Sequence, residues 1–181
     1  MLGPVHAEWA SWDGTRVEQF ALRWEGGGYV AEGTVSGLDI HYVIRLGPDF
    51  RTRQFLLFRD LDEPDLWLAR DHYGRWGEMN GAARNDLDEC FEIDLGCSPF
   101  TNTIPIRSLG GALPIGESVS IDVAWVDVET LGVTVSPQSY TRLAEHRWRF
   151  EASHRAYEAE FDVDEHGLVL DYPGLFRRIM G

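Results

Sequence analysis

The segment Asp94–Gly110, DLGCSPFTNTIPIRSLG, divides the chain into two halves that are rich in predicted strands. It shows neither the alternation of a strand nor a simple turn signal. Within it, Thr103–Leu109 is predicted as a short helix, because a threonine can cap its start, a proline lies in its first turn and Gly110 follows its end. Weaker helix candidates are Gly81–Glu89 and Gly174–Met180.

Apolar and polar residues alternate on both sides of this segment, as they do in strands with one buried face. The alternation is clearest in Leu38–Leu46, Ser118–Val126 and Arg155–Val163. Turn signals recur roughly every 8–12 residues, which is typical of an all-β sandwich, barrel or roll. The other predicted strands are Thr15–Trp24, Tyr29–Val35, Arg51–Arg59, Leu66–Arg70, Phe91–Leu95, Leu131–Val135, Tyr140–Leu143, His146–Glu151 and Leu168–Tyr172. Pro137 is expected to end the strand before it, because proline has no N–H to donate.

The length and composition indicate one globular domain over residues 1–181. The net charge is −14 and all sixteen basic residues are arginine. Such an acidic surface repels nucleic-acid phosphates and anionic lipid head groups, so we expect no nucleic-acid partner. The chain lacks an export signal and a run of about 18 apolar residues, which predicts a cytoplasmic protein without stable membrane insertion.

Motifs for metal, cofactor or nucleophilic chemistry are missing from the sequence. Cys90 and Cys97 match no zinc pattern and are expected as free thiols, and the histidines form neither HxH nor HExxH. No GxGxxG, P-loop or GxSxG motif occurs, so no cofactor and no metal are predicted. Four carboxylates in or beside strands could form a glycosidase-like pair only if the fold brings two of them together: Asp94, Asp122, Asp127 and Asp171.

Polar residues that lie in apolar or turn-rich surroundings are the candidates for ligand binding: Asn102, Arg107, Tyr140 and Tyr172. An arginine offers a planar fork of donors for carboxylate or phosphate, and Tyr and Asn can hydrogen-bond sugar hydroxyls. A purely structural interpretation is also open, in which Asn102 caps the short helix and Arg107 pairs with a nearby carboxylate such as Asp94. The seven tryptophans likewise suit either a cavity wall or an ordinary core.

Three stretches together resemble a known family. They are the central FEIDLGCSPFTNTIPIRSLG (Phe91–Gly110), the C-terminal FDVDEHGLVLDYPGLFRR (Phe161–Arg178), and the run Tyr42–Arg53, in which a strand precedes a D-x-x-x-R pattern. The chain is similar to the bacterial glycolipid-binding family, first catalogued only as a domain of unknown function. It departs from the family pattern at Phe50 and Phe176, where tryptophan is expected and an aromatic ring is kept.

The resemblance implies a mainly β fold: a spiral β-roll or half-barrel of antiparallel strands wrapped around a single helix, similar to the periplasmic lipoprotein carriers. It also implies a homodimer.

The leading hypothesis is a non-catalytic protein that binds a glycolipid or a fatty-acyl compound. The apolar tail would lie against the inner strand faces. The expected binding residues are Asp94, Asn102, Arg107, Tyr140 and Tyr172. Two alternatives remain open: a homodimeric structural protein whose roll is filled by side chains, and a hydrolase that uses Asp94 or Asp171.

Overall fold

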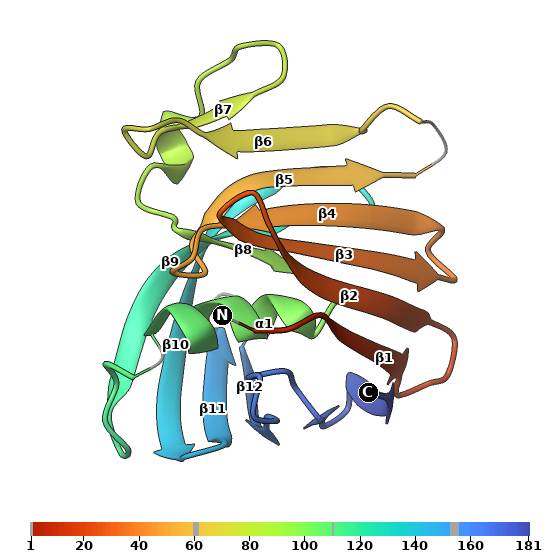
Figure 1. Cartoon of the computed structure of the whole chain (residues 1–181), viewed down its shortest axis with the longest axis vertical. Helices are drawn as coiled ribbons and strands as arrows, with labels where there is room; N and C mark the ends of the chain where they lie inside the picture. Colours follow the sequence, from red (N-terminus) through yellow and green to blue (C-terminus); the bar gives the residue numbers. More distant parts are fainter. Residues whose placement is uncertain (1, 60–61, 110, 153–155) are drawn as a thin grey trace.

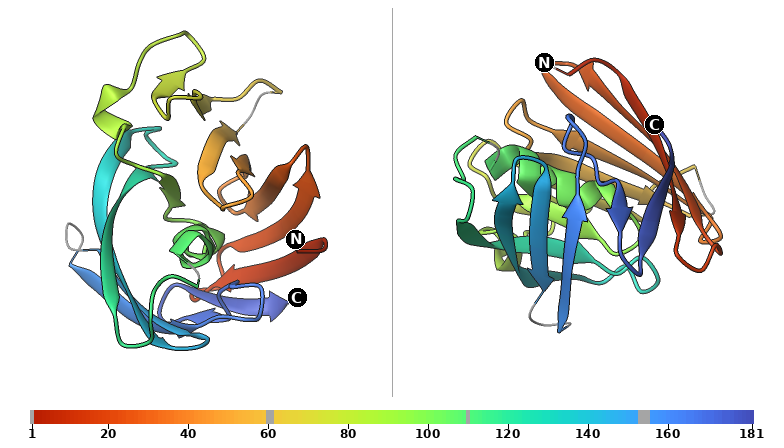
Figure 2. Two further views of the ribbon diagram at one scale, coloured as in Figure 1. Left: turned by 60° about the vertical axis from the view of Figure 1, so that its left-hand side comes forward. Right: turned by 90° about the horizontal axis from the view of Figure 1, so that it is seen from below.

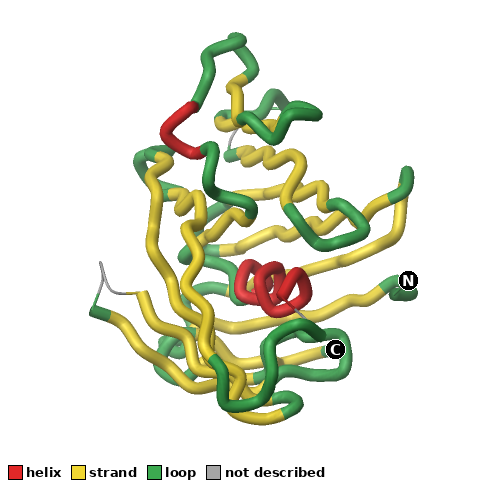
Figure 3. Tube along the Cα trace, turned by 90° about the vertical axis from the view of Figure 1, so that its left-hand side faces the viewer, coloured by secondary structure: helices red, strands yellow, loops and turns green. Residues whose placement is uncertain are grey.

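The computed structural model describes residues 2–59, 62–109, 111–152 and 156–181. Two β-sheets curl around one buried α-helix, α1 (Phe100–Leu109), as Figure 1 shows. The helix is seen nearly end-on inside the ring of strands in the left view of Figure 2, and again among the strands in Figure 3. The predicted mainly β roll around a single helix is therefore confirmed.

The larger sheet has nine strands in the order β13-β14-β1-β2-β3-β4-β5-β6-β7. Their bounds are β1 (Val5–Ser11), β2 (Val17–Glu25), β3 (Gly28–Ser36), β4 (Ile40–Leu46), β5 (Thr52–Phe58), β6 (Leu66–Arg70), β7 (Trp76–Glu78), β13 (Asp171–Tyr172) and β14 (Phe176–Met180). The smaller sheet has the order β12-β11-β10-β9-β8. Its strands are β8 (Glu92–Leu95), β9 (Ser118–Val126), β10 (Val133–Ala144), β11 (Arg147–Ala152) and β12 (Tyr157–Asp162).

One strand pair corrects the expectation of purely antiparallel pairing. β8 and β9 run parallel, with Glu92 opposite Val123 and Leu95 opposite Val126. Neighbouring parallel strands need a crossover connection, and here α1 lies in that connection. The helix is thus tied by the chain to two adjacent strands of the smaller sheet.

The strands with strong alternation were predicted well, since β4, β9 and β12 fall inside the predicted ranges. Arg155, where the last of these predictions begins, lies outside the described residues. β1 was missed, and the helix proposed for Gly174–Met180 is wrong because this stretch forms β14. Pro137 does not end a strand either: β10 runs through it. Among the described residues, β11 pairs with β10 from Ser139 onward, and Pro137 itself pairs with Asp122 of β9.

The helix α1 begins three residues earlier than predicted, at Phe100. Pro105 consequently lies in the helix interior, and Asn102 is a helical residue and not its cap. Ser98 supplies a side-chain acceptor at this end, because its Oγ lies 3.3 Å from the Phe100 N–H. Gly110, the predicted stop, is outside the described residues. Only a 3-10 turn, η1 (Asn85–Leu87), forms within the weaker candidate Gly81–Glu89.

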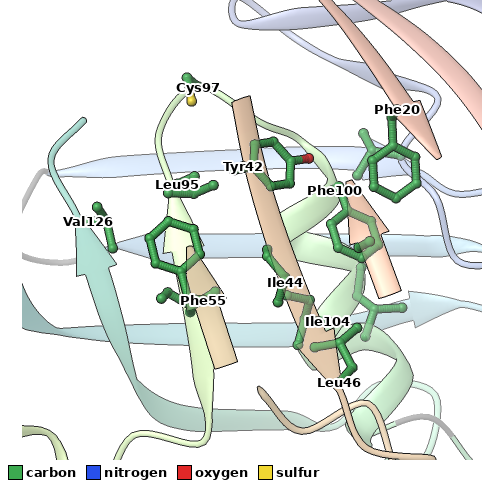
Figure 4. Close-up of a cluster of buried hydrophobic side chains, with 14 of the residues drawn as sticks. Phe20, Tyr42, Ile44, Leu46, Phe55, Leu95, Cys97, Phe100, Ile104 and Val126 are labelled. Atoms are coloured by element: carbon green, nitrogen blue, oxygen red, sulfur yellow. The ribbon is translucent and has the colours of Figure 1, made fainter. Parts of the chain in front are cut away.

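The core fills the space between α1 and the larger sheet. The Phe100 ring stacks on Phe20 of β2 at 4.3 Å, and Ile104 lies beside Ile44 and Leu46 of β4 in Figure 4. All five side chains are buried. Each such side chain contributes about 1.5–3 kcal/mol when it leaves water, so this interface holds the helix firmly against the larger sheet.

Candidate functional site

A cavity of about 220 Å³ remains beside the N-terminal half of α1, where the helix faces β11, β12 and the C-terminal strands. Its wall is polar in one part, with Asp94, Ser98 and Asn102, and aromatic in another, with Phe150, Tyr157, Tyr172 and Phe176. We call it the Asp94–Tyr172 cavity. It combines hydrogen-bonding groups with flat apolar surfaces in one small space.

The polar part of the wall is held in place by hydrogen bonds of Asp94, which is buried on β8. Its Oδ1 accepts a hydrogen bond from Thr101 Oγ1 at 2.9 Å, and its Oδ2 accepts one from Gln138 Nε2 at 2.7 Å. Thr101 belongs to α1 and Gln138 to β10. The carboxylate therefore links the helix to two strands, its own β8 and β10.

The side chain of Asn102 is also held by a hydrogen bond, which comes from Tyr140 of β10. The Tyr140 hydroxyl lies 3.1 Å from Asn102 Oδ1 and 3.2 Å from Gln138 Oε1, and with one proton it donates to one of them at a time. Asn102 Nδ2 makes no hydrogen bond with the described residues. Since Asn102 lines the cavity, its amide is available to a bound molecule.

The aromatic part of the wall is built from rings that pack on each other. Tyr157 and Tyr172 are stacked with ring centres 6.0 Å apart and an interplanar angle of 10°. Phe161 stacks on Tyr172 at 4.8 Å, and Phe150 meets Tyr172 edge to face at 6.3 Å. Mutual packing restricts the rotation of these rings.

Behind the cavity lies a buried carboxyl group that the sequence did not single out. Glu18 of β2 accepts hydrogen bonds at Oε1 from Ser98 Oγ at 2.7 Å and from the Tyr42 hydroxyl at 2.5 Å. Its Oε2 has no hydrogen-bond partner among the described residues. Burial disfavours the charged form and raises the pKa of Glu18 to about 7, although the two hydrogen bonds oppose that shift.

Four of the five predicted binding residues come together, and the fifth lies apart. Asp94, Asn102 and Tyr172 line the cavity, and Tyr140 lies directly behind Asn102. Arg107 instead lines a second cavity of about 340 Å³ beside the C-terminal half of α1, together with Arg142, His146 and Trp148.

The structural alternative for Arg107 is wrong. Its guanidinium lies over the Phe50 ring at 5.2 Å and forms no ion pair with Asp94, although both residues are described. The proposed capping role of Asn102 fails as well, because Asn102 lies within the helix.

Several residues of the site were missed from the sequence: Ser98, Gln138, Phe150, Tyr157 and Phe176. Phe150 and Tyr157 belong to predicted strands, and their alternation marks an inward-facing side, but it does not tell a core from a cavity wall. Gln138 follows a proline that was taken as a strand end. Ser98 and Phe176 lie inside the two long motifs, which were the only signal available for them.

Other classes of site find no support in the described residues. No cluster of three or more His, Cys, Asp or Glu side chains could hold a metal ion there. Asp171 is exposed on β13, while Asp94 is buried and lines the cavity. Within the same residues, no helix is long and apolar enough to cross a membrane.

Comparison with known proteins agrees with the fold and the motifs. The fold is similar to a crystal structure of a DUF1089 family protein from Pseudomonas aeruginosa, with a TM-score of 0.69 and 29% sequence identity, covering 99% of this chain and 94% of that chain. No curated protein matches the chain. Residues 6–178 match the family described as "Putative glycolipid-binding". Since that match spans nearly the entire sequence, the chain belongs to this family.

Proposed function

We propose that the protein binds a glycolipid by its sugar head group, which occupies the Asp94–Tyr172 cavity. The observation that carries this proposal is the division of the cavity wall into a polar part and an aromatic part. A sugar ring presents C–H groups on its faces and hydroxyl groups around its rim. Stacked aromatic rings suit the faces, and a carboxylate and an amide suit the hydroxyls.

The size of the cavity favours the head group over the lipid tail. Pockets for drug-sized ligands measure about 300–1,000 Å³, and this cavity of about 220 Å³ is smaller. The inner faces of the larger sheet, where a tail was expected, are occupied by buried side chains such as Phe20, Tyr42 and Phe55. We therefore place the alkyl chain at the mouth of the cavity, where Leu175 lines the wall and is 39% exposed.

We propose that binding occurs without catalysis and in the cytoplasm. Both oxygens of Asp94 already accept hydrogen bonds from protein groups, which suits a positioning role better than proton transfer. Cys90 and Cys97 are buried free thiols, which suits a reducing compartment. Screening ester and glycoside substrates would contradict the first proposal if turnover were found and then lost in Asp94→Asn.

We also propose a homodimer, formed through the surface around β14. Large apolar side chains are exposed here: Trp12 at 53%, Ile179 at 51% and Met180 at 59%. Trp12 directly follows β1, whose last residue Ser11 pairs with Phe176 of β14. Light scattering after gel filtration measures the mass, and a 20.5 kDa species at micromolar concentration would contradict the dimer.

The head-group proposal is tested by titrating the protein with n-octyl glucoside below its micelle concentration and following tryptophan fluorescence. Saturable binding is expected, with competition by free glucose. Asn102→Ala removes the amide that faces the cavity and should weaken binding about tenfold, the effect of one or two hydrogen bonds.

Asn85→Ala is the matched control, because Asn85 is exposed on η1 and far outside the cavity wall. It should leave the affinity unchanged. Equal binding by the wild type and Asn102→Ala, or no competition by glucose, would show that the sugar does not occupy this cavity.

A further inference from the structure

A second group of polar residues surrounds a cleft of about 610 Å³ between the start of β5, the β6–β7 turn and the residue before β8. Three arginines line it, Arg51, Arg53 and Arg70, and so do Thr52 and Phe91. We call it the Arg51–Arg70 cleft. None of its lining residues belongs to the Asp94–Tyr172 cavity.

Two of the arginines share one aromatic ring. The guanidinium carbon of Arg51 lies 4.4 Å from the centre of the Phe91 ring, and that of Arg70 lies 4.6 Å from the same centre. Arg70 is also fixed through Nε and Nη2, which donate to the Gly74 carbonyl at 2.9 and 2.8 Å. Burial, and next the nearby charge of Arg51, lower the pKa of Arg70. The two like charges thus share one ring and one cleft, and they are near enough for the charge of Arg51 to lower the pKa of Arg70.

No carboxylate of the described residues forms a close ion pair with Arg51, Arg53 or Arg70, although the charges of Glu92 and Asp88 act on Arg70 from a distance. The ion pair of Arg51 is a loose one, with 3.9 Å between its Nε and Asp49 Oδ2. Arg53 forms no ion pair or hydrogen bond with the described residues. Asp71, the other acidic residue of the cleft, is already bound by Arg75 through two hydrogen bonds of 3.0 and 2.8 Å. In a chain of net charge −14, this cleft therefore gathers three arginines that lack a close ion pair among the described residues.

Two residues next to Arg51, Phe50 and Thr52, have unfavourable local features that are consistent with a binding site. Phe50 adopts a left-handed conformation with φ of 64°, which is strained for an aromatic residue, and its side chain is buried while Arg51 is exposed. Thr52 is 1% exposed, and its Oγ1 has no hydrogen-bond partner among the described residues. Both features have a cost in stability, which a ligand-binding role would explain.

We propose that the Arg51–Arg70 cleft binds the phosphate group of a small phosphorylated molecule. Arginine forks match the oxygens of phosphate with paired, charge-assisted hydrogen bonds, and a dianion would relieve the repulsion between the two guanidinium groups. The volume leaves room for a further group attached to the phosphate. This site is separate from the proposed sugar site, so either can fail without the other.

Calorimetric titration of the full chain at low ionic strength tests the proposal, with inorganic phosphate and glycerol 3-phosphate as probes. Saturable binding is expected, and Arg51→Gln and Arg53→Gln should each weaken it by about tenfold. Both side chains are exposed, so the variants should keep the fold. Arg147→Gln is the matched control: it makes the same charge change on β11, where Arg147 is paired with Glu160 and Asp162 and is similarly exposed.

Co-sedimentation with vesicles of phosphatidylglycerol and phosphatidylcholine separates the two sources of such a phosphate. Vesicle binding that is lost in Arg51→Gln supports a lipid head group, and binding of glycerol 3-phosphate alone supports a soluble ester. The proposal is overturned if neither probe nor vesicle binds the wild type, or if Arg147→Gln weakens binding as much as Arg51→Gln does. Unchanged octyl glucoside binding in Arg51→Gln would show that the sugar site is independent.

Discussion

Glu18 is a residue whose chemistry depends strongly on burial. It is 2% exposed, lies behind the Asp94–Tyr172 cavity and contacts Ser98 and Tyr42, and its pKa is raised from 4.5 to about 7. The folded state therefore holds a proton that the unfolded chain releases between pH 4.5 and 7. The free energy of unfolding contains a contribution from Glu18 that falls as pH rises through this range.

Replacing Glu18 by Gln tests this dependence, because glutamine has a similar shape and cannot ionise. Relative to the wild type, Glu18→Gln should gain stability between pH 5 and pH 8, by on the order of 3 kcal/mol at most. Urea unfolding at the two pH values measures the difference. A stability difference that is the same at both would contradict the raised pKa, and Glu117→Gln, at an exposed position, serves as the control.

Single residues also show why the site was only half predictable. Asp94, Asn102 and Tyr172 lie in two unusual motifs, and their polar character stands out in the sequence. Their partners do not: Gln138 is 44 residues from Asp94, and Tyr140 is 38 from Asn102. Contacts at such separations depend on the order of the strands, which no local pattern reveals. Arg107 was grouped with the others by sequence proximity, although the helix directs it to another cavity.

At the scale of elements, helix α1 depends on polar contacts as well as on its packed apolar face. The Thr101 hydroxyl donates to Asp94 and also lies 3.3 Å from the Leu95 N–H. Thr103, two residues further along the helix, is fully buried, and its hydroxyl has no hydrogen-bond partner among the described residues. The two threonines therefore offer a matched comparison within one helix.

Thr101→Val should lower the free energy of unfolding by about 1–3 kcal/mol, because it leaves a buried carboxylate oxygen without its donor. Thr103→Val should leave the free energy of unfolding unchanged or raise it, since it removes a buried hydroxyl that forms no hydrogen bond with the described residues. Chemical denaturation of both variants measures the effects. Equal losses in the two would mean that steric packing of valine, and not the hydrogen bond to Asp94, decides the outcome.

Elements with strong alternation were predictable, and those without it were not. β9 matches its predicted range residue for residue, because apolar side chains recur at every second position. β14 has adjacent apolar residues at Ile179 and Met180, so its sequence shows no period of two, and the stretch was named as a weaker helix candidate. β10 was divided at Pro137 in the prediction, but the strand runs through this residue, which pairs with Asp122 of β9.

At the scale of the whole molecule, the two sheets and the helix share one interior. Cys90 is 0% exposed and Cys97 is 2% exposed, so both thiols lie inside this shared core. Burial raises the pKa of Cys90 to about 12 and that of Cys97 further still. The thiolate is the reactive form, so both groups are protected by the closed roll.

Neither cysteine should react with Ellman's reagent in the native protein at pH 8 on the timescale of minutes, and both should react at once in 6 M guanidinium chloride. The native labelling rate then measures how often the roll opens. Rapid labelling of one thiol without denaturant would show that the part of the core around it opens independently. Mass spectrometry of the labelled peptides identifies which thiol has reacted.

The crossover that places α1 between β8 and β9 limits the routes by which a small molecule could enter the Asp94–Tyr172 cavity. A helix joined at both ends to neighbouring strands and packed on the opposite sheet cannot swing aside as a lid. The opposite side of the cavity is held by fewer strand pairs. There, β13 pairs with β14 through two residues, Asp171 and Tyr172. If a sugar binds in the cavity as proposed, we expect it to enter at the corner formed by Tyr172–Phe176, with the helix staying in place.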